Sequence, residues 1–157
     1  MIIKPIDQND RGRIDAFIVD HWYTLNMVVR GESIDLGCAD GFYACEGGEI
    51  TGLITYRLTG CEMEILSLDS LHEGQGIGTA LLNAAVGKAK EIGAGRINLI
   101  TTNDNLSAMR FYQKRGFRMV RIYRDALDLA RKIKPEIPLI GIDGIPLKDE
   151  IEFELEL

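Results

Sequence analysis

Three glycines in the segment Glu73-Gly74-Gln75-Gly76-Ile77-Gly78 lie between an apolar segment and a segment with helical periodicity. Glycines allow backbone N–H groups to converge where a side chain would block them. The first turn of a helix adds N–H groups that lack a helical partner and carry a partial positive charge. We therefore expect the backbone amides of residues 74–79 to bind an anion such as a phosphate or a pyrophosphate.

Two familiar nucleotide-binding motifs do not fit this loop. A dinucleotide-binding fingerprint would need glycine at Thr79 or Leu81, and a P-loop would need a Gly-Lys-Ser/Thr sequence, which is absent. The spacing Glu73-x-x-Gly76-x-Gly78 instead resembles the acetyl-CoA loop of the GCN5-related N-acetyltransferase (GNAT) family, which reads Gln/Arg-x-x-Gly-x-Gly/Ala. Glu73 departs from that pattern, and a carboxylate there would repel a phosphate. We expect its side chain to turn away from the ligand.

A second segment is similar to another motif of the same family. It reads Asn105-x-x-Ala108-x-x-Phe111-Tyr112-x-x-x-Gly116-Phe117. Asn105 can cap a helix that ends at Gly116, which supplies the left-handed backbone of a helix end. Because both motifs occur in the expected order, the chain is identified as resembling the GNAT family over nearly its whole length.

The resemblance implies transfer of an acetyl group from acetyl-CoA to a primary amine, by direct attack within a ternary complex. It places the acid that protonates the departing thiolate at Tyr112, although a tyrosine there could also simply pack the helix. The backbone of Leu66 and Leu68 would pair with the pantetheine arm, and the Leu68 N–H would polarise the thioester. The cofactor-binding residues implied are Leu66, Leu68, Gly74, Gln75, Gly76, Ile77, Gly78, Thr79, Asn105, Ala108 and Tyr112.

The base that deprotonates the amine has two candidates on the strand before the glycine loop, Glu62 and Glu64. Counted back from the glycines, Glu62 lies where histone-modifying members of the family carry their base. Strict strand alternation would place both carboxylates on one face with Leu66 and Leu68. A solvated edge-strand role for either glutamate is the alternative. His21 and Tyr23 are candidates for the acceptor pocket, and a packed Trp22 with a surface His21 is the alternative there.

The composition restricts the other classes of function. A net charge of −6 disfavours nucleic acid as a partner, because phosphate binding needs clustered Lys and Arg. Three cysteines without a CxxC pair and only two histidines favour a cytoplasmic protein with reduced thiols and no metal site. No apolar run is long enough to span a bilayer, and the first residues lack the layout of a signal peptide.

The periodicities predict an α/β fold: a mixed, mostly antiparallel, twisted sheet of six to seven strands with helices on both faces. The expected strands are 2–6, 41–46, 50–58, 61–69, 96–102, 117–124 and 151–157, and residues 26–40 read as a loop with a short helix. Acetyl-CoA should lie where two central strands splay. We expect a single domain over residues 1–157, and the sequence leaves a homodimer open.

Residues 125–149 form an expected insertion between the last two strands. The insertion could cover the acceptor end of the cleft, which would favour a small-molecule amine, or it could be a packing extension. A protein N-terminus or a lysine is the alternative acceptor. A rival from another class is a module that binds acyl-CoA without turning it over. The sequence names neither the acceptor nor the preferred acyl chain.

Overall fold

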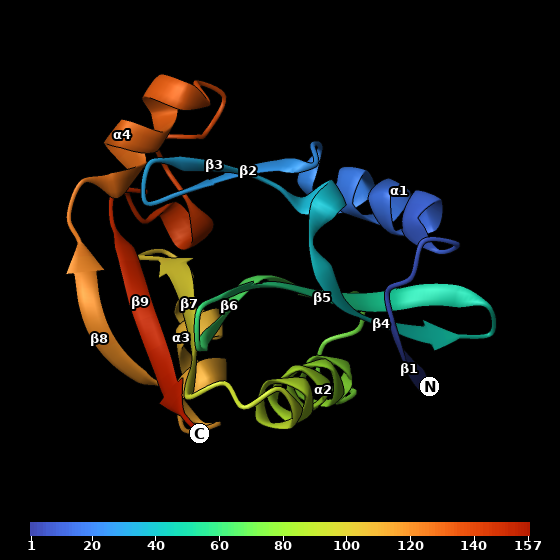
Figure 1. Cartoon of the computed structure of the whole chain (residues 1–157). Coiled ribbons are helices and arrows are strands. Elements are labelled where there is room, and N and C mark those ends of the chain that lie inside the picture. Colours follow the sequence, from blue (N-terminus) through green and yellow to red (C-terminus); the bar gives the residue numbers. More distant parts are fainter. The chain divides into compact units, whose positions relative to one another are not determined.

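The computed structural model describes residues 1–157, whose internal contacts divide the chain into two compact units (Figure 1). The first unit contains Met1–Asn26, Asp35–Ile97 and Leu157. The second unit contains Met27–Ile34 and Asn98–Glu156. The main sheet has seven strands, and a separate pair of short strands forms a hairpin.

Four strands of the first unit lie in the order β1-β4-β5-β6, and every neighbouring pair is antiparallel. Their bounds are β1 (Ile2–Pro5), β4 (Asp40–Glu46), β5 (Glu49–Thr59) and β6 (Glu62–Ser70). A turn at Gly47-Gly48 joins β4 to β5, and both glycines have positive φ angles. Three antiparallel strands therefore lead to the glycine loop, as the sequence predicts.

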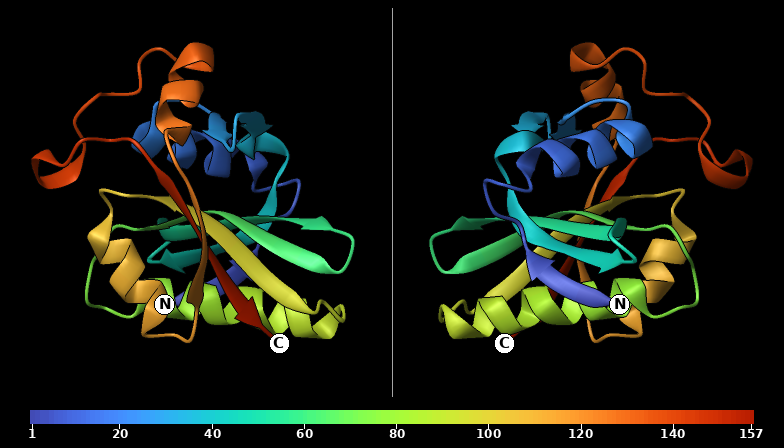
Figure 2. Two further views of the ribbon diagram at one scale, coloured as in Figure 1. Left: turned by 90° about the vertical axis from the view of Figure 1, so that its left-hand side faces the viewer. Right: turned by 90° about the vertical axis from the view of Figure 1, so that its right-hand side faces the viewer.

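The helices α1 (Arg11–Trp22) and α2 (Ile77–Glu91) cover opposite faces of these strands (Figures 1 and 2). α1 buries Ile14, Phe17 and Ile18. α2 lies so close to β5 that a Cβ atom built on Gly52 would come within 2.7 Å of Ile77. A glycine is therefore needed at this point of β5 for α2 to pack against the sheet.

The strands of the second unit lie in the order β7-β9-β8 and comprise β7 (Arg96–Thr102), β8 (Arg118–Tyr123) and β9 (Glu150–Glu156). The chain passes into this unit within β7, whose first two residues belong to the first unit. β8 and β9 are antiparallel. The helix α3 (Leu106–Gln113) packs the Tyr112 ring near the rings of Phe117 and Phe153. The predicted α/β fold with a mostly antiparallel sheet is confirmed.

Residues 26–40 differ from the loop that their sequence predicts. They form a hairpin of β2 (Asn26–Val29) and β3 (Glu32–Asp35), followed by the short 3₁₀ helix η1 (Leu36–Cys38). Arg30 and Gly31 between the strands both have positive φ angles, 50° and 73°. Consecutive positive φ angles are typical of two-residue hairpin turns, where Asn-Gly is the usual signal. Because an arginine occupies the first turn position, the sequence does not indicate this hairpin.

The segment between β8 and β9 folds into α4 (Ala126–Ile133) and a 3₁₀ turn, η2 (Ile142–Gly144). A small buried cluster of Ala126, Leu127, Ala130 and Leu147 holds this segment together. Val28 of β2 packs against that cluster, and a Cβ atom built on Gly31 would lie 2.9 Å from Leu129. Figure 1 shows the hairpin reaching α4. None of the helices is both long and apolar enough to cross a membrane.

Candidate functional site

The start of α2 has no cap from the protein itself. Gly76 precedes the helix with a φ of 79°, no side chain caps the helix, and its first turn carries no acidic residue. The first helical hydrogen bond runs from the Ala80 N–H to the Gly76 carbonyl. The N–H groups of Ile77 and Gly78 therefore have no acceptor within the helix. This arrangement provides partial positive charge and donors for an anion.

The glycine loop before α2 is open. Gly74 and Gly76 both have positive φ angles, and no protein atom lies within 4 Å of a Cβ atom built on either residue. Glu73 and Gln75 are exposed, Ile77 is buried in the core, and Gly78 and Thr79 are half-buried. Glu73 makes no hydrogen bond or ion pair within the protein, so its side chain is not held against the loop.

A β-bulge interrupts β6 directly before the loop. Tyr56 of β5 lies opposite Ile65, whereas its neighbour Thr55 lies opposite Ser67. Leu66 is therefore the extra residue of the bulge. Because an extra residue disrupts the local ladder of backbone hydrogen bonds, this part of β6 can offer backbone groups to a ligand. Leu66, predicted to pair with pantetheine, lies at this point.

The bulge changes which residues share a face of β6. Residues directly opposite each other in an antiparallel pair point to the same side of the sheet. The register sets Glu62, Glu64, Ser67 and Asp69 opposite Thr59, Arg57, Thr55 and Leu53, which alternate along one face of β5. Leu68 lies opposite Ile54 on the other face. The expectation that Glu62 and Glu64 share a face with Leu68 is therefore wrong.

The two predicted base candidates each contact an arginine. Glu64 is buried, and its carboxylate accepts a hydrogen bond of 2.7 Å from Nε of Arg57. Glu62 is half-buried and forms a two-pronged ion pair with Arg96 at the start of β7. Both Arg96 donors bind the same oxygen of Glu62, and Arg57 binds one oxygen of Glu64, in strong charge-assisted hydrogen bonds. Proton abstraction by either glutamate would have to compete with that pairing.

Asp69 is a third carboxylate on the same face of β6, and the sequence analysis assigned it no role. Its Oδ2 accepts a hydrogen bond of 2.8 Å from the Trp22 indole at the end of α1. The other carboxylate oxygen makes no hydrogen bond within the protein and reaches solvent. Burial raises the pKa of Asp69, and the Trp22 hydrogen bond and His21 partly oppose that shift. A strand-end aspartate just before the glycine loop was the available sequence signal.

The acceptor-pocket candidates on α1 lie in different surroundings. His21 stacks on Phe17 with a ring separation of 4.2 Å, and its Nδ1 lies 2.7 Å from the Phe17 carbonyl oxygen. Tyr23 has a left-handed backbone at the end of the helix and is 90% exposed. Trp22 is only partly packed, because 37% of its surface remains exposed.

The second motif forms the start and core of α3. The Oδ1 atom of Asn105 accepts a hydrogen bond of 3.1 Å from the Ala108 N–H, so the predicted helix cap is confirmed. Gly116 has the predicted positive φ angle, 92°. Tyr112 is buried, and its ring makes edge-to-face contacts with Phe111 and Phe117. These contacts fix the orientation of its ring.

The chain before α3 holds the segment that precedes β9. Asn103 accepts hydrogen bonds from the N–H groups of Lys148 and Asp149, and it donates one to the Pro146 carbonyl. The buried Asp104 accepts from the Ile142 N–H at 2.8 Å and from the Thr102 hydroxyl. The 125–149 insertion is thereby fixed to the residues next to Asn105.

Glu150 is a further buried carboxylate for which the sequence predicts no role. It is 3% exposed and accepts a hydrogen bond of 3.1 Å from the Arg30 N–H in the β2–β3 turn. Burial raises the pKa of Glu150, and Arg30 partly opposes this. Its position within an alternating acidic strand gave no sign of this burial.

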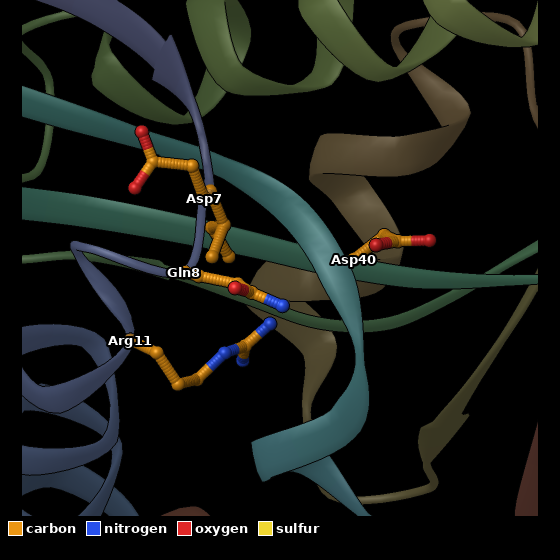
Figure 3. Close-up of a pocket in the computed structure, with 5 residues that line it drawn as sticks. Asp7, Gln8, Arg11 and Asp40 are labelled. Carbon is orange, nitrogen blue, oxygen red and sulfur yellow. The ribbon is translucent and has the colours of Figure 1, made fainter.

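A separate hollow lies at the beginning of α1, lined by Ile6, Asp7, Gln8, Arg11 and Asp40 (Figure 3). Arg11 donates a hydrogen bond of 2.7 Å to the Ala39 carbonyl, and Asp7 accepts from the N–H of Asn9. α1 is twelve residues long and separates this hollow from Trp22 by about 16 Å. The hollow contains none of the predicted site residues.

Comparison with known proteins identifies a matching family and related proteins. Residues 20–117 match the acetyltransferase (GNAT) family. The chain is 45% identical to the Bacillus subtilis protein YdhI over 154 residues, covering 98% of this chain and 96% of YdhI. It is 42% identical to YxbD of the same organism over 158 residues, covering 100% of this chain and 99% of YxbD.

Two solved structures show the same fold over nearly the whole chain. An IAA acetyltransferase from Bacillus cereus superposes with a TM-score of 0.72 at 25% identity, covering 99% of both chains. A GNAT family acetyltransferase from Elizabethkingia anophelis with acetyl-CoA bound has a TM-score of 0.70 at 23% identity, covering 99% of this chain and 97% of its own.

Proposed function

The chain belongs to the acetyltransferase (GNAT) family, and from that premise we propose that it transfers acetyl from acetyl-CoA to a primary amine of a small molecule. The observation that carries the proposal is the uncapped start of α2 behind the open glycine loop. Its free N–H groups suit the pyrophosphate of coenzyme A. The acetyl-CoA in the Elizabethkingia relative supports this choice of ligand.

The reaction makes three chemical demands on the protein. A primary ammonium has a pKa of about 10, so it must lose a proton before its nitrogen can attack the thioester. The thioester oxygen then gains negative charge. We assign the Leu68 N–H as the hydrogen-bond donor that stabilises this charge. The departing thiolate takes a proton, which we assign to Tyr112. Holding amine and thioester together can supply roughly 7 to 11 kcal/mol of the acceleration.

The preference for a small-molecule acceptor rests on the insertion. Asn103 and Asp104 fix residues 141–149 beside Asn105, which we assign to contact with the pantetheine arm. An ordered segment beside Asn105 would narrow the open groove that a peptide acceptor needs in order to bind. A peptide or protein acceptor therefore remains the alternative that the experiment must separate.

The alternative without catalysis is an acyl-CoA sensor, and the pairing of Glu62 with Arg96 and of Glu64 with Arg57 favours it specifically. If these two glutamates are the only candidate bases, their ion pairs oppose turnover. The variant Tyr112→Phe separates the enzyme from the sensor, because it removes the hydroxyl of the proposed acid and keeps the packed ring. We expect unchanged acetyl-CoA binding and acetyl transfer at least tenfold slower. Tyr123→Phe is the matched control, since it removes another tyrosine hydroxyl of the same unit.

The first experiment incubates the protein with isotopically labelled acetyl-CoA and a small-molecule extract, followed by mass spectrometry. A labelled product that forms with the native protein and the Tyr123→Phe control, but more slowly with Tyr112→Phe, would support the enzyme and identify its acceptor. Labelled peptides in a parallel digest, without a small-molecule product, would support a protein acceptor. Tight acetyl-CoA binding without any labelled product would support the sensor.

A further inference from the structure

Three carboxylates lie on the α1-facing side of β6, and their surroundings differ. Glu62 and Glu64 are engaged by Arg96 and Arg57. Asp69 has no cationic partner, and its only hydrogen bond comes from the neutral indole of Trp22. The other oxygen of the Asp69 carboxylate accepts no hydrogen bond within the protein and is open to solvent.

The chain itself places Asp69 close to the proposed reaction centre. Asp69 follows Leu68, whose N–H we assign to the thioester oxygen, and precedes the anion-binding loop by four residues. The register puts Leu68 and Asp69 on opposite faces of β6, with Asp69 on the face that α1 covers. A thioester held along the backbone at Leu68 would therefore have the Asp69 carboxylate within a few ångströms, on the α1-facing side.

The contact with Trp22 fixes the Asp69 carboxylate. The indole N–H is a donor only, so it must bind an ionised or neutral carboxyl oxygen and cannot itself compete for a proton. Trp22 keeps more than a third of its surface exposed, and its neighbour His21 is held by Phe17. The indole also offers an apolar and π-rich wall, which suits a cationic amine beside a carboxylate.

We propose that Asp69 binds the ammonium group of the acceptor and accepts its proton, with Trp22 as the residue that positions the carboxylate. The inference rests on the proposed acetyltransferase function and assigns the base to a residue other than Glu62 and Glu64. It also assigns the acceptor class: an amine that is cationic in solution.

The proton balance of the step is complete. The acceptor ammonium gives one proton to the Asp69 carboxylate, and its nitrogen lone pair forms the bond to the thioester carbon. The carbon–sulfur bond then breaks and leaves coenzyme A as a thiolate. Tyr112 gives that thiolate a proton and regains one from the nitrogen of the new amide. Asp69 finally releases its proton to solvent, so that the products are the amide, the free thiol and one proton.

The raised pKa of Asp69 supports the same role. A base whose pKa lies nearer to the working pH accepts a proton more readily than an ordinary aspartate. Burial is the main cause of the shift, and His21 on α1 acts against it. The other charged groups on this face form two ion pairs, Glu64 with Arg57 and Glu62 with Arg96, so each charge is neutralised by its partner. We expect kcat/KM to rise with pH through the Asp69 pKa, because only the carboxylate form can take the proton.

The test measures release of the coenzyme A thiol from acetyl-CoA with four probe amines: propylamine, tyramine, spermidine and the tripeptide Ala-Gly-Phe. Asp69→Asn keeps the size of the side chain and an oxygen acceptor for Trp22 but removes the base. We expect kcat/KM for the best probe amine to fall by roughly 10²-fold to 10⁴-fold, with acetyl-CoA affinity unchanged. The acidic limb of the pH profile should disappear with it.

Two further variants separate a catalytic role from a structural one. Trp22→Phe leaves the carboxylate and removes its donor, so kcat/KM should fall less than in Asp69→Asn and the acidic limb should persist. Asp20→Asn removes an exposed carboxylate of α1 and should change neither quantity. Thermal unfolding of each variant verifies that it is folded.

The possible results separate an error in the assignment of Asp69 from an error in the proposed acetyltransferase function. If the native protein acetylates a probe amine and Asp69→Asn does so within threefold and with the native pH profile, the assignment of Asp69 is wrong. It is also wrong if Asp69→Asn loses activity only in proportion to its loss of thermal stability. If the native protein binds acetyl-CoA but acetylates neither the four amines nor any compound of the small-molecule extract, the proposed function fails and the assignment falls with it.

Discussion

Two junctions between a strand and a helix are built in opposite ways, although both carry motifs of the same family. At the β6–α2 junction the protein leaves the helix start uncapped and open to solvent. At the β7–α3 junction the protein supplies its own groups: Asn105 caps the helix, and Asp104 holds the insertion. The first junction is therefore available to an anion, whereas the second is a structural anchor beside the proposed pantetheine contact.

The largest expected effect concerns the open β6–α2 junction, and a pair of glycine substitutions tests whether it binds an anion. Gly76 and Gly60 both have positive φ angles with no neighbouring atoms around a built Cβ, so alanine at either costs about 1–2 kcal/mol of stability. Only Gly76→Ala alters the donors at α2. We expect acetyl-CoA binding, measured by calorimetry, to weaken at least tenfold in Gly76→Ala and to stay unchanged in Gly60→Ala. Equal binding by the two variants would refute the anion site at α2.

At the β7–α3 junction we expect a substitution to lower the stability of the protein. A Cβ atom on Gly141 would lie 2.1 Å from Oδ2 of Asp104, so Gly141→Ala must displace that carboxylate or the insertion. We expect a loss of about 1–3 kcal/mol in the free energy of unfolding, measured by urea denaturation. Gly12→Ala is the control: Gly12 lies in α1 with open surroundings, and alanine should stabilise that helix by about 0.5–1 kcal/mol.

The helix cap itself distinguishes anchoring from ligand binding. Asn105→Ala removes the acceptor for the Ala108 N–H and should cost about 1 kcal/mol of stability. Asn105→Asp keeps the cap and adds a charge that the helix start favours, so it should recover the native stability. If Asn105 also contacts acetyl-CoA, Asn105→Asp will be as stable as the native protein but will bind the cofactor more weakly. Native affinity in that variant would leave Asn105 with the cap alone.

The smallest effect concerns the residue that departs from the family pattern. Glu73 is exposed and unpaired beside the open loop, where its charge opposes an anion. Glu73→Arg should tighten acetyl-CoA binding about threefold to tenfold at low ionic strength, and the gain should shrink as salt is added. Glu49→Arg makes the same charge change at the start of β5 and should leave affinity unaffected. Weaker binding by Glu73→Arg would give Glu73 a positive role.

Most of the element order could be predicted from the sequence, because glycines and caps mark it locally. Gly116 has the left-handed backbone that the sequence predicts, and Asn105 makes the expected cap. The glycines at Gly47-Gly48 and Gly76 also have positive φ angles. The β2–β3 hairpin was missed, since its turn begins with Arg30, a residue that rarely adopts positive φ. Local signals therefore succeed where the usual residue occupies the usual conformation.

The candidate site was less predictable, because it depends on register and burial. Counting by twos placed Glu62 and Glu64 with Leu68, but the bulge at Leu66 reverses that relation, and no residue type announces it. The arginine partners of Glu62 and Glu64 come from neighbouring strands, so their pairing requires the sheet. Asp69 and Glu150 likewise resemble ordinary surface acids until α1 and the β2–β3 turn bury them.

The bulge at Leu66 also limits how β6 can change in length during evolution. Deleting this one residue would restore regular alternation and leave every later side chain on its present face, because Ile65 and Ser67 already lie opposite the adjacent residues Tyr56 and Thr55. Deleting Leu68 instead would shift the residues after it by one position and exchange their faces. Asp69 would then point toward Ile77 and Leu81, the face of the sheet that α2 covers. Among functional relatives, a gap should therefore be tolerated at Leu66 and rare between Leu68 and the glycine loop.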